Sequence, residues 1–240
     1  MKAMIFAAGL GTRLKPLTDT LPKALVKVNG VPMLERTILH LKRHGITDII
    51  INVHHLADQV EQFLKDKDHF DLNLQVSDER ELLLDTGGGL KKASWFFNDK
   101  EDFIAINSDI ITDLDLQSVV NYHKKNDAMA TLVVRERKSS RCFLFDQNFK
   151  LSGWKNESNS TSILTNESTE LKGFPFSGIH VINSSLFKYI TREGKFSIVD
   201  TYLELSKTKP IYGFLDKGTT WFDIGDAGKL KLAEKALGNN

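Results

Sequence analysis

The first 135 residues alternate short runs of branched and aromatic residues with amphipathic segments, and this alternation restricts the fold more than any other feature. Five runs have the length of buried strands, at 2–7, 48–53, 72–76, 102–107 and 128–134. Helical patterns lie between them at 31–44, 55–66 and 114–125. Strands that alternate with helices of this length predict an α/β fold with a Rossmann-like, doubly wound, mostly parallel sheet. Ligands of such folds bind beyond the carboxyl ends of the strands.

The second half of the sequence is less regular. Residues 136–172 are polar, and 156–170 within them predict either a mobile loop or an excursion of hairpins. Apolar pattern resumes at 176–182, and helical stretches follow near 184–191, 198–207 and 226–237. A chain of 240 residues can build one large core and is hardly long enough for two. We therefore predict one domain over 1–240, with 136–172 as a variable excursion.

Charge and composition exclude several classes of protein. The formal net charge is +1, so no basic excess is present to hold nucleic acid or an acidic membrane, and we expect neither as a partner. No apolar stretch approaches the ~20 residues that span a bilayer, and the opening run is too short for a signal peptide. Cys142 is the single cysteine, which allows no intramolecular disulfide and no cysteine-based zinc site. These features favour a cytoplasmic protein.

Residues 7–25 are too rich in glycine and proline to be a helix or strand throughout, and they predict a loop after the first strand. Gly9 and Gly11 allow backbone N–H groups to approach a phosphate closely, and Thr12 adds a hydroxyl. Arg13 can offer a bidentate fork to phosphate oxygens, and Lys23 can neutralise a second phosphate. Neither the dinucleotide fingerprint nor the P-loop pattern is complete here. Phosphate binding is the interpretation we prefer, and a tight turn with solvated charges is the alternative.

The same stretch resembles the signature of the sugar-1-phosphate nucleotidyltransferases. The sequence "GLGTRLKPLTDTLPKAL…VNGVPML" fits G-x-G-T-R-x-x-P-L-T, then P-K-x-L, then V-x-G-x-P-M/L. Similarity continues at 85–93, 106–113, 176–179 and 221–226, and so covers nearly the whole chain. The resemblance implies that a phosphate oxygen of a sugar 1-phosphate attacks the α-phosphorus of a nucleoside triphosphate. The products would be a nucleotide sugar and pyrophosphate.

The resemblance also implies which residues bind the nucleotide: Ala8, Gly9, Leu10, Gly11, Thr12, Arg13, Lys23, Thr86, Gly87 and Gly88. Arg13 is expected at the β- and γ-phosphates and Lys23 near the reacting centre, and with Asp109 they form the expected catalytic set. The run Thr86-Gly87-Gly88-Gly89 is predicted to open a helix near Leu90, where a base would rest against bare backbone. A merely flexible start of that helix is the alternative.

Asp109 directly follows the strand 102–107, at the position where a carboxylate commonly holds Mg²⁺. The resemblance implies that Asp223, in Trp-Phe-Asp-Ile-Gly, shares this metal with it. Ser108 stands where the family usually has glycine, which we expect to do little harm. A turn or helix cap is the alternative role for Asp109. The neighbouring Asp113, Asp115 and Asp226 are interpreted as helix caps or solvated charges.

On the acceptor side, Ser177 and Gly178 resemble the family's sugar-phosphate contacts, and Asn52 is a weaker candidate. Segment 136–172 departs most from the family pattern, where sugar contacts are expected. The short chain, its abrupt end and the Thr-Gly-Gly-Gly run most resemble the N-acetylmuramate α-1-phosphate uridylyltransferases of cell-wall recycling, which implies UTP. Mannose or heptose 1-phosphate with GTP, or phosphocholine with CTP, are the alternatives. The sequence gives no indication of oligomeric state.

The sequence also bears on a non-catalytic alternative and on four histidines. A non-catalytic nucleotide-sugar sensor on the same fold should have lost Arg13, Lys23 or a metal aspartate, and all are present. The pairs His40/His44 and His54-His55 have metal-like spacing, but no third ligand is evident. We therefore predict that they are histidines on helix surfaces.

Overall fold

The computed structural model describes residues 1–99, 101–167 and 170–238. Seven strands form the central sheet in the order β14-β8-β13-β6-β1-β4-β5. Their bounds are β1 Lys2–Phe6, β4 Asp48–Val53, β5 Asn73–Asp78, β6 Asp102–Asn107, β8 Ala130–Val134, β13 Phe176–Asn183 and β14 Ile211–Leu215. Strand β13 runs antiparallel to both of its neighbours, while the other pairings within this sheet are parallel. The predicted mostly parallel sheet is confirmed.

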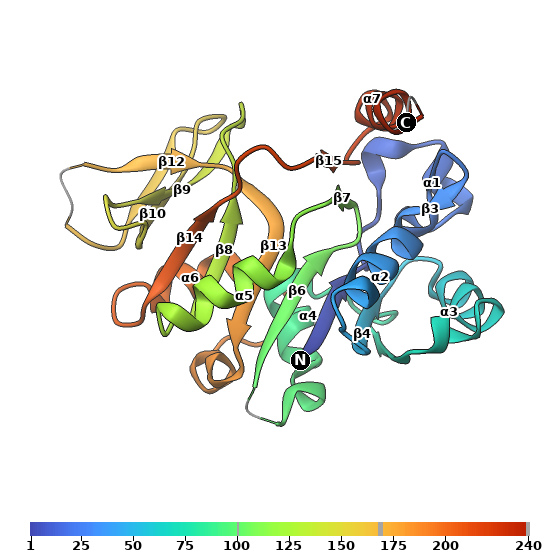
Figure 1. Cartoon of the computed structure of the whole chain (residues 1–240), viewed down its shortest axis with the longest axis horizontal. Coiled ribbons are helices and arrows are strands. Elements are labelled where there is room, and N and C mark those ends of the chain that lie inside the picture. The colour runs from blue at the N-terminus through green and yellow to red at the C-terminus, as the bar shows by residue number, and fades with distance from the viewer. Residues whose placement is uncertain (100, 168–169, 239–240) are drawn as a thin grey trace.

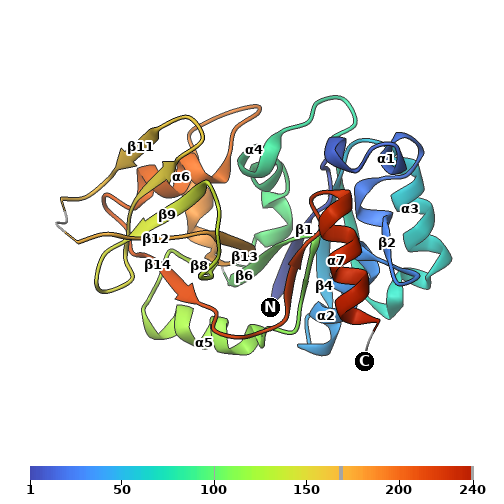
Figure 2. The ribbon, with the colours of Figure 1, turned by 90° about the horizontal axis from the view of Figure 1, so that it is seen from above.

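Side chains of each strand alternate between two separate cores, because successive residues of a strand point to opposite faces of the sheet. In β1, Ala3 and Ile5 pack on one face and Met4 on the other. The first face is covered by α2 (Met33–Arg43), α3 (Ala57–Asp66) and α5 (Leu116–Lys125), and the second by α4 (Asp85–Lys92) and α6 (Ile198–Leu205). Figure 2 shows α2 and α5 on one side of the sheet and α4 and α6 on the other. The sheet is therefore doubly wound, in a single domain.

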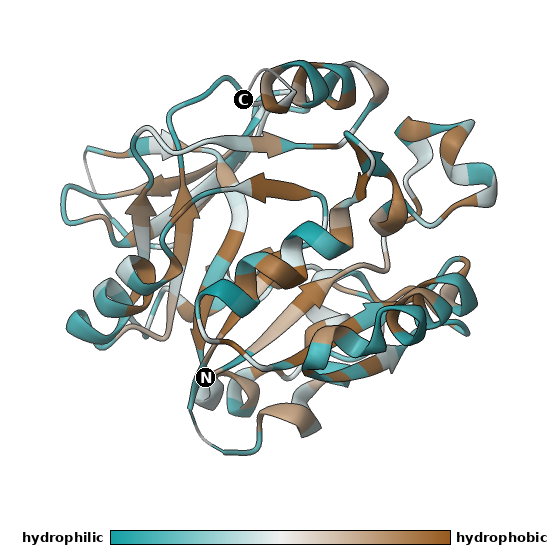
Figure 3. Cartoon of the chain, turned by 45° about the vertical axis from the view of Figure 1, so that its right-hand side comes forward, coloured by the Kyte–Doolittle hydropathy of each residue, from teal (hydrophilic) through white to brown (hydrophobic). Residues whose placement is uncertain are grey.

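Helix α2 illustrates why these segments become helices. Leu34, Ile38 and Leu41 recur at helical spacing and are fully buried against the sheet. Gly45 follows the helix with a φ of 72°, the left-handed conformation that commonly ends helices. Hydrophobic residues gather along the strands, while the helices carry both hydrophilic and hydrophobic residues (Figure 3). Within the described ranges, no helix has both the length and the apolar character that a bilayer crossing requires.

Much of the polar stretch 136–172 forms antiparallel strands, and within 156–170 a turn and a strand form a hairpin with the strand that precedes them, one of the two alternatives left open for that segment. Strands β9 (Arg141–Phe145), β10 (Leu151–Asn156), β11 (Thr161–Leu164) and β12 (Lys172–Phe174) make a second, antiparallel sheet in the order β11-β10-β9-β12. Phe143, Phe145 and Leu151 pack into the core that α6 covers. This sheet lies at the end of the molecule away from α3 (Figure 1).

Two further small ladders are present, one between distant segments and one a local hairpin. Strand β7 (Ile110–Thr112) pairs with β15 (Trp221–Asp223), and β2 (Lys27–Val28) pairs with β3 (Val31–Pro32). Helix α7 (Ala227–Leu237) follows β15 and packs Leu230 and Ala233 against Leu14 and Val28 in a third core. The last helix therefore lies beside the opening segment, as Figures 1 and 2 both show.

The remaining helical elements are short turns. The opening segment contains η1 (Thr12–Leu14), α1 (Leu17–Thr20) and η2 (Lys23–Leu25), so it is neither one helix nor one strand, as predicted. The others are η3 (Asp68–Asp71), η4 (Ser94–Phe97) and η5 (Ser184–Tyr189). The predicted helix near 184–191 is thus a 3₁₀ helix.

Candidate active site

A cavity of about 330 Å³ opens beyond the carboxyl ends of β1, β4, β5 and β6, the edge where the fold predicts a ligand. Its floor is formed by the ends of these strands, and its rim by the opening loop and the start of α4. The lining residues are Phe6, Ala7, Ala8, Gly9, Lys23, Asn52, Glu79, Leu83, Asp85, Thr86, Asn107, Ser108, Asp109 and Lys195. The cavity therefore brings together residues of the opening loop and of the start of α4, the two segments predicted to bind the nucleotide.

The opening loop is folded around Gly11, which has a φ of 65°. The Gly11 carbonyl accepts a hydrogen bond from Thr18 Oγ1 at 2.8 Å, and a Cβ at position 11 would lie only 2.8 Å from Thr18 Cγ2. The left-handed backbone and this close approach together explain the glycine. Ala8 and Gly9 line the cavity, whereas Leu10, Thr12 and Arg13 are exposed on the outer part of the loop.

Arg13 lies close to Asp223, one of the two aspartates that are predicted to bind a metal ion. A Cβ built on Gly225 would lie 3.0 Å from Arg13 Nη2 and 3.0 Å from Asp223 Oδ1. The guanidinium and this carboxylate therefore meet at one glycine, although they lie far apart in the sequence. Gly225 is buried, and its missing side chain leaves room for both groups.

Lys23 and Asp109 form an ion pair inside the cavity. Lys23 begins η2 and Asp109 lies between β6 and β7, so the pair joins the opening loop to the end of the central sheet. The two side chains are only 15% and 17% exposed. Partial burial strengthens the attraction relative to a surface pair, because water screens it less.

The ladder β7–β15 brings Asp223 next to Asp109. Asp223 stands opposite Ile110, and Ile224 N donates a hydrogen bond to Asp109 O at 2.9 Å. Asp223 Oδ2 also accepts a hydrogen bond from Lys229 Nζ at 2.6 Å. The spacing of the two aspartates in the sequence does not indicate that they meet, and the structure shows that they lie side by side.

The donor set fits Mg²⁺. Magnesium prefers oxygen ligands, keeps several waters, and is often bound through one or two carboxylates plus substrate phosphates. Asp109 and Asp223 supply two such carboxylates at one end of a ladder. Across the described residues, no group of three or more His, Cys, Asp and Glu side chains is placed to hold a metal ion. Waters and substrate phosphates would therefore have to complete the coordination.

Helix α4 starts at Asp85, so the prediction that a helix opens near Leu90 is wrong. Gly87 N and Gly88 N both donate to Phe196 O, at 2.9 and 3.2 Å. A Cβ at Gly87 would lie 2.4 Å from two Phe196 ring carbons, and one at Gly88 would lie 2.1 Å from Gly194 O. These glycines thus permit close packing of segment 194–198 on the helix. Thr86 lines the cavity, whereas Gly87 and Gly88 are not among its lining residues.

Asn52 and Glu79 form a buried polar wall of the cavity. Asn52 Oδ1 accepts from Ala7 N at 2.7 Å, and Asn52 Nδ2 donates to Glu79 Oε1 at 2.7 Å. Glu79 Oε2 accepts from Leu84 N at 3.0 Å, and both residues are at most 3% exposed. Asn52 therefore lines the same cavity as Thr86. Ser177, with which it was predicted to contact the sugar phosphate, does not line this cavity. Glu79 was missed by sequence reasoning, because it carries no motif.

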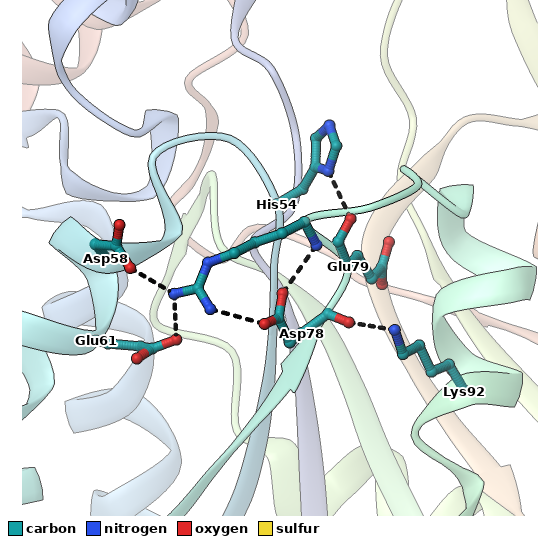
Figure 4. Close-up of polar contacts among 7 residues, drawn as sticks. His54, Asp58, Glu61, Asp78, Glu79 and Lys92 are labelled. Carbon is teal, nitrogen blue, oxygen red and sulfur yellow. Dashed lines mark hydrogen bonds and ion pairs between the residues drawn. The ribbon is translucent and has the colours of Figure 1, made fainter.

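Ion pairs around Arg80 fix the end of β5 next to Glu79 (Figure 4). Arg80 contacts the carboxylates of Asp58, Glu61 and Asp78, each at 2.7 Å. The backbone N–H of Arg80 also donates to Asp78, which lowers the pKa of that carboxyl. These contacts hold the backbone on both sides of Glu79.

Ser177 and Gly178 lie beside the β7–β15 ladder and are not among the residues that line the cavity. Ser177 is fully buried, and its carbonyl accepts from Trp221 Nε1 at 3.0 Å. Gly178 has a φ of 81°, and a Cβ there would lie 2.8 Å from Ile110 Cγ1 and 3.1 Å from Asn107 Nδ2. The structure therefore brings this pair next to Asp109 and Asp223 through their backbone.

Lys195 is a second cavity residue that sequence reasoning missed. The backbone on either side of it is fixed on α4, since Phe196 N donates to Leu84 O at 3.1 Å and Ile198 N to Thr86 Oγ1 at 3.1 Å. The exposed Lys195 side chain lines the cavity, and no ion pair involves it among the described residues. Without knowledge of these contacts, it was one lysine among many in the sequence.

The other sequence interpretations have mixed outcomes. Asp115 and Asp226 cap α5 and α7 as predicted, accepting from Gln117 N at 3.1 Å and Lys229 N at 2.9 Å. The surface interpretation of His40 is wrong, since the residue is 5% exposed. Burial, together with the nearby charge of His44, lowers the pKa of His40 to about 4. The buried side chain belongs to the packing of α2.

Comparison with known proteins agrees with this geometry. The family described as "Nucleotidyl transferase" matches residues 2–143. A UTP–glucose-1-phosphate uridylyltransferase of Synechocystis sp. is 30% identical over 94% of this chain, which spans 60% of that relative's length. An N-acetylmuramate α-1-phosphate uridylyltransferase of Neisseria meningitidis serogroup B is 28% identical over 99% of both chains. The structure of HddC from Yersinia pseudotuberculosis with GMP-PN has a TM-score of 0.79 at 23% identity, covering 98% of this chain and 99% of that one.

Proposed function

The chain belongs to the nucleotidyl transferase family, and we propose that it transfers a nucleotidyl group from a nucleoside triphosphate to a sugar 1-phosphate, with release of pyrophosphate. One observation carries the proposal. Arg13, Lys23, Asp109 and Asp223 converge at the carboxyl edge of the sheet, at the cavity that opens there. Such a set of cations and carboxylates suits the joining of two polyanions.

The proposed reaction needs no general base, because the attacking phosphate oxygen is already an anion. Its difficulty is to hold two polyanions in line and to stabilise the leaving pyrophosphate. Lys23 and Arg13 supply positive charge on the opening loop for this purpose. When bound by Asp109 and Asp223, Mg²⁺ would supply Lewis-acid stabilisation of phosphate oxygens.

Each protein group has a distinct role in this proposal. Lys23 would exchange its contact with Asp109 for a phosphate near the reacting centre, and Arg13 would bind the β- and γ-phosphates. The backbone at Ala8 and Gly9 would line the triphosphate. The base would lie toward Thr86, against the wall that Asn52 and Glu79 form.

For the substrates, we propose UTP and N-acetylmuramate 1-phosphate. The support is the Neisseria relative of that name, which matches this chain over 99% of both lengths. On this proposal, the enzyme works in the cytoplasm in cell-wall recycling. The alternatives are mannose or heptose 1-phosphate with GTP, and phosphocholine with CTP. A non-catalytic sensor is disfavoured, because Arg13, Lys23, Asp109 and Asp223 are all retained.

The test is an assay of pyrophosphate release with Mg²⁺, crossing four nucleoside triphosphates with a panel of sugar 1-phosphates and phosphocholine. Release that is greatest with UTP and N-acetylmuramate 1-phosphate supports the full proposal. Preference for GTP with mannose or heptose 1-phosphate keeps the reaction and replaces the substrates, and CTP with phosphocholine replaces the acceptor class. No release with any pair overturns the enzymatic proposal.

A further inference from the structure

Arg137 is fixed over the tryptophan of β15, on the side of the site that carries the second sheet. Its guanidinium carbon lies 4.9 Å from the centroid of the Trp221 ring, and its Nη2 donates to Phe176 O at 3.0 Å. Trp221 is itself held, because its Nε1 donates to Ser177 O at 3.0 Å. The stacked and hydrogen-bonded guanidinium is therefore oriented rather than free to rotate.

Its neighbour Arg135 has a different role. Arg135 Nη1 pairs with the buried Asp216 at 2.9 Å, and Nη2 donates to Thr219 O at 2.9 Å. The charge of Arg135 is thus used within the fold. For Arg137, no carboxylate lies within ion-pair distance in the part of the chain that the structure describes. Its positive charge remains available to a ligand.

Arg137 is close to the predicted metal residues. Trp221 and Asp223 are two residues apart on β15, so their side chains share one face of the strand. Because Arg137 is stacked on Trp221, its guanidinium lies on the face of β15 that also carries Asp223. An arginine keeps its charge at neutral pH.

The same side chain lines a separate hollow of about 660 Å³ on the second sheet. Hydroxyls of Ser139 and Ser140 and the charged groups of Lys155 and Glu157 also line this hollow. Hydroxyl, ammonium and carboxylate groups are suitable hydrogen-bond partners for a sugar. Arg137 therefore joins a polar hollow, with room for a sugar ring, to the edge at Asp223.

We propose that Arg137 binds the phosphate of the acceptor sugar 1-phosphate, with the sugar in this hollow. The inference rests on the proposed function and identifies the acceptor side of that site. In an in-line displacement, the attacking and leaving oxygens lie on opposite sides of the α-phosphorus. The acceptor phosphate consequently needs a cation distinct from Arg13 and Lys23, which come from the opening loop. Arg137, in contrast, follows β8 and lies on the side of the site that carries the second sheet.

The experiment compares Arg137→Gln and Arg137→Lys with Arg141→Gln, which removes an exposed arginine four residues away. We expect Arg137→Gln to raise KM for the sugar 1-phosphate about 10–100-fold, the range of a charge-assisted hydrogen bond, with KM for the triphosphate within about twofold. Arg137→Lys should fall between, because it keeps the charge and loses the fork. Arg141→Gln should change neither KM. Equal effects on both substrates, or none on the acceptor, overturn the proposal.

Failure of this inference and failure of the proposed function give different results. If the unaltered protein turns over no pair, the enzymatic proposal falls, and calorimetric titration with the members of the sugar 1-phosphate panel then tests Arg137 by itself. Binding that is present in the unaltered protein and lost in Arg137→Gln supports the acceptor site. Equal binding to both proteins, or binding of no member of the panel, overturns it.

Discussion

Lys229 Nζ lies 2.6 Å from Asp223 Oδ2, so that an ammonium of α7 is paired with one predicted metal carboxylate. Lys23 makes the corresponding pair with Asp109 from the opening loop. Each aspartate is therefore neutralised by a lysine from a different element. These lysines offset the mutual repulsion of two neighbouring carboxylates in one site.

The pair at α7 predicts the effect of Lys229→Met. Removal of the ammonium should strengthen the binding of Mg²⁺ at Asp223, because the lysine competes for the same oxygen. We expect half-maximal activity at roughly 2–5-fold lower Mg²⁺, which corresponds to the ~0.5–1 kcal/mol of a partly exposed ion pair. Mg²⁺ titrations of activity measure this shift. Lys231→Met, at an exposed position of the same helix, is the control, and a higher Mg²⁺ requirement in Lys229→Met would contradict the competition.

Asp109→Asn tests the centre of the proposed site. The amide keeps the shape of the side chain and loses the charge that would hold the metal. Loss of one stabilising group typically costs ~10²–10³ in kcat, and we expect at least this from steady-state kinetics on the folded variant. Asp115→Asn is the matched control, since asparagine caps a helix as well as aspartate does. Near-normal turnover in Asp109→Asn would remove this residue from the mechanism.

Lys195→Gln tests the cavity lysine that the sequence did not single out. Its side chain lines the same cavity as Lys23 and Asp109, while the backbone beside it is fixed on α4. We expect KM for the triphosphate to rise roughly 5–20-fold with little change in Tm, as for the loss of a partly exposed charged contact. Lys207→Gln, exposed after α6, should leave KM unchanged. A KM for Lys195→Gln equal to that of this control would exclude a contact with the triphosphate.

Local patterns predicted the strands and helices well, because hydrophobic periodicity is a property of consecutive residues. The alternation in β1 and the spacing of Leu34, Ile38 and Leu41 in α2 are readable without tertiary contacts. The β7–β15 ladder was not predicted, since three-residue strands carry almost no periodic signal. Its consequence, the placement of Asp223 next to Asp109, came from the resemblance and not from spacing.

The missed residues depend on contacts between distant segments. Glu79 is buried because Asn52 and Leu84 satisfy its carboxylate, and a lone glutamate in the sequence indicates neither partner. The start of α4 was placed too late, because three successive glycines predict a break in a helix. Packing of Phe196 against Gly87 and Gly88 outweighs that propensity.

Gly88→Ala tests this packing. Helix propensity alone would favour alanine by about 1 kcal/mol, but its Cβ would lie 2.1 Å from the backbone oxygen of Gly194. The clash requires the backbone to move, so we expect a net loss of ~1–3 kcal/mol in the free energy of unfolding, measured with urea. Gly9→Ala is the control, because its nearest neighbour would be Lys23 Cδ at 3.9 Å. Unchanged stability in Gly88→Ala would refute the packing explanation.

Two buried histidines predict how stability depends on pH. Burial lowers the pKa of His180 to about 3, and burial with the charges of His44 and Arg43 lowers the pKa of His40 to about 4. His180 Nδ1 also contacts Tyr202 Oη at 2.5 Å. The unfolded chain regains a pKa of about 6.5 at both positions, so below that pH it binds more protons than the folded chain. The stabilisation is complete above pH ~6.5 and is lost as the pH falls toward the folded values.

Each histidine should therefore reduce the free energy of unfolding by somewhat over 1 kcal/mol between pH 6 and pH 5, about 2 kcal/mol for the pair. Carboxyls with lowered pKa values, such as Asp102, act mainly at lower pH. Urea unfolding at pH 6.5, 6.0, 5.5 and 5.0 measures the slope. In His40→Gln the slope should fall by about half, since only His180 still takes up a proton on unfolding. If the slope of this variant equals that of the unaltered protein, protonation of His40 in the unfolded chain is not what weakens the fold.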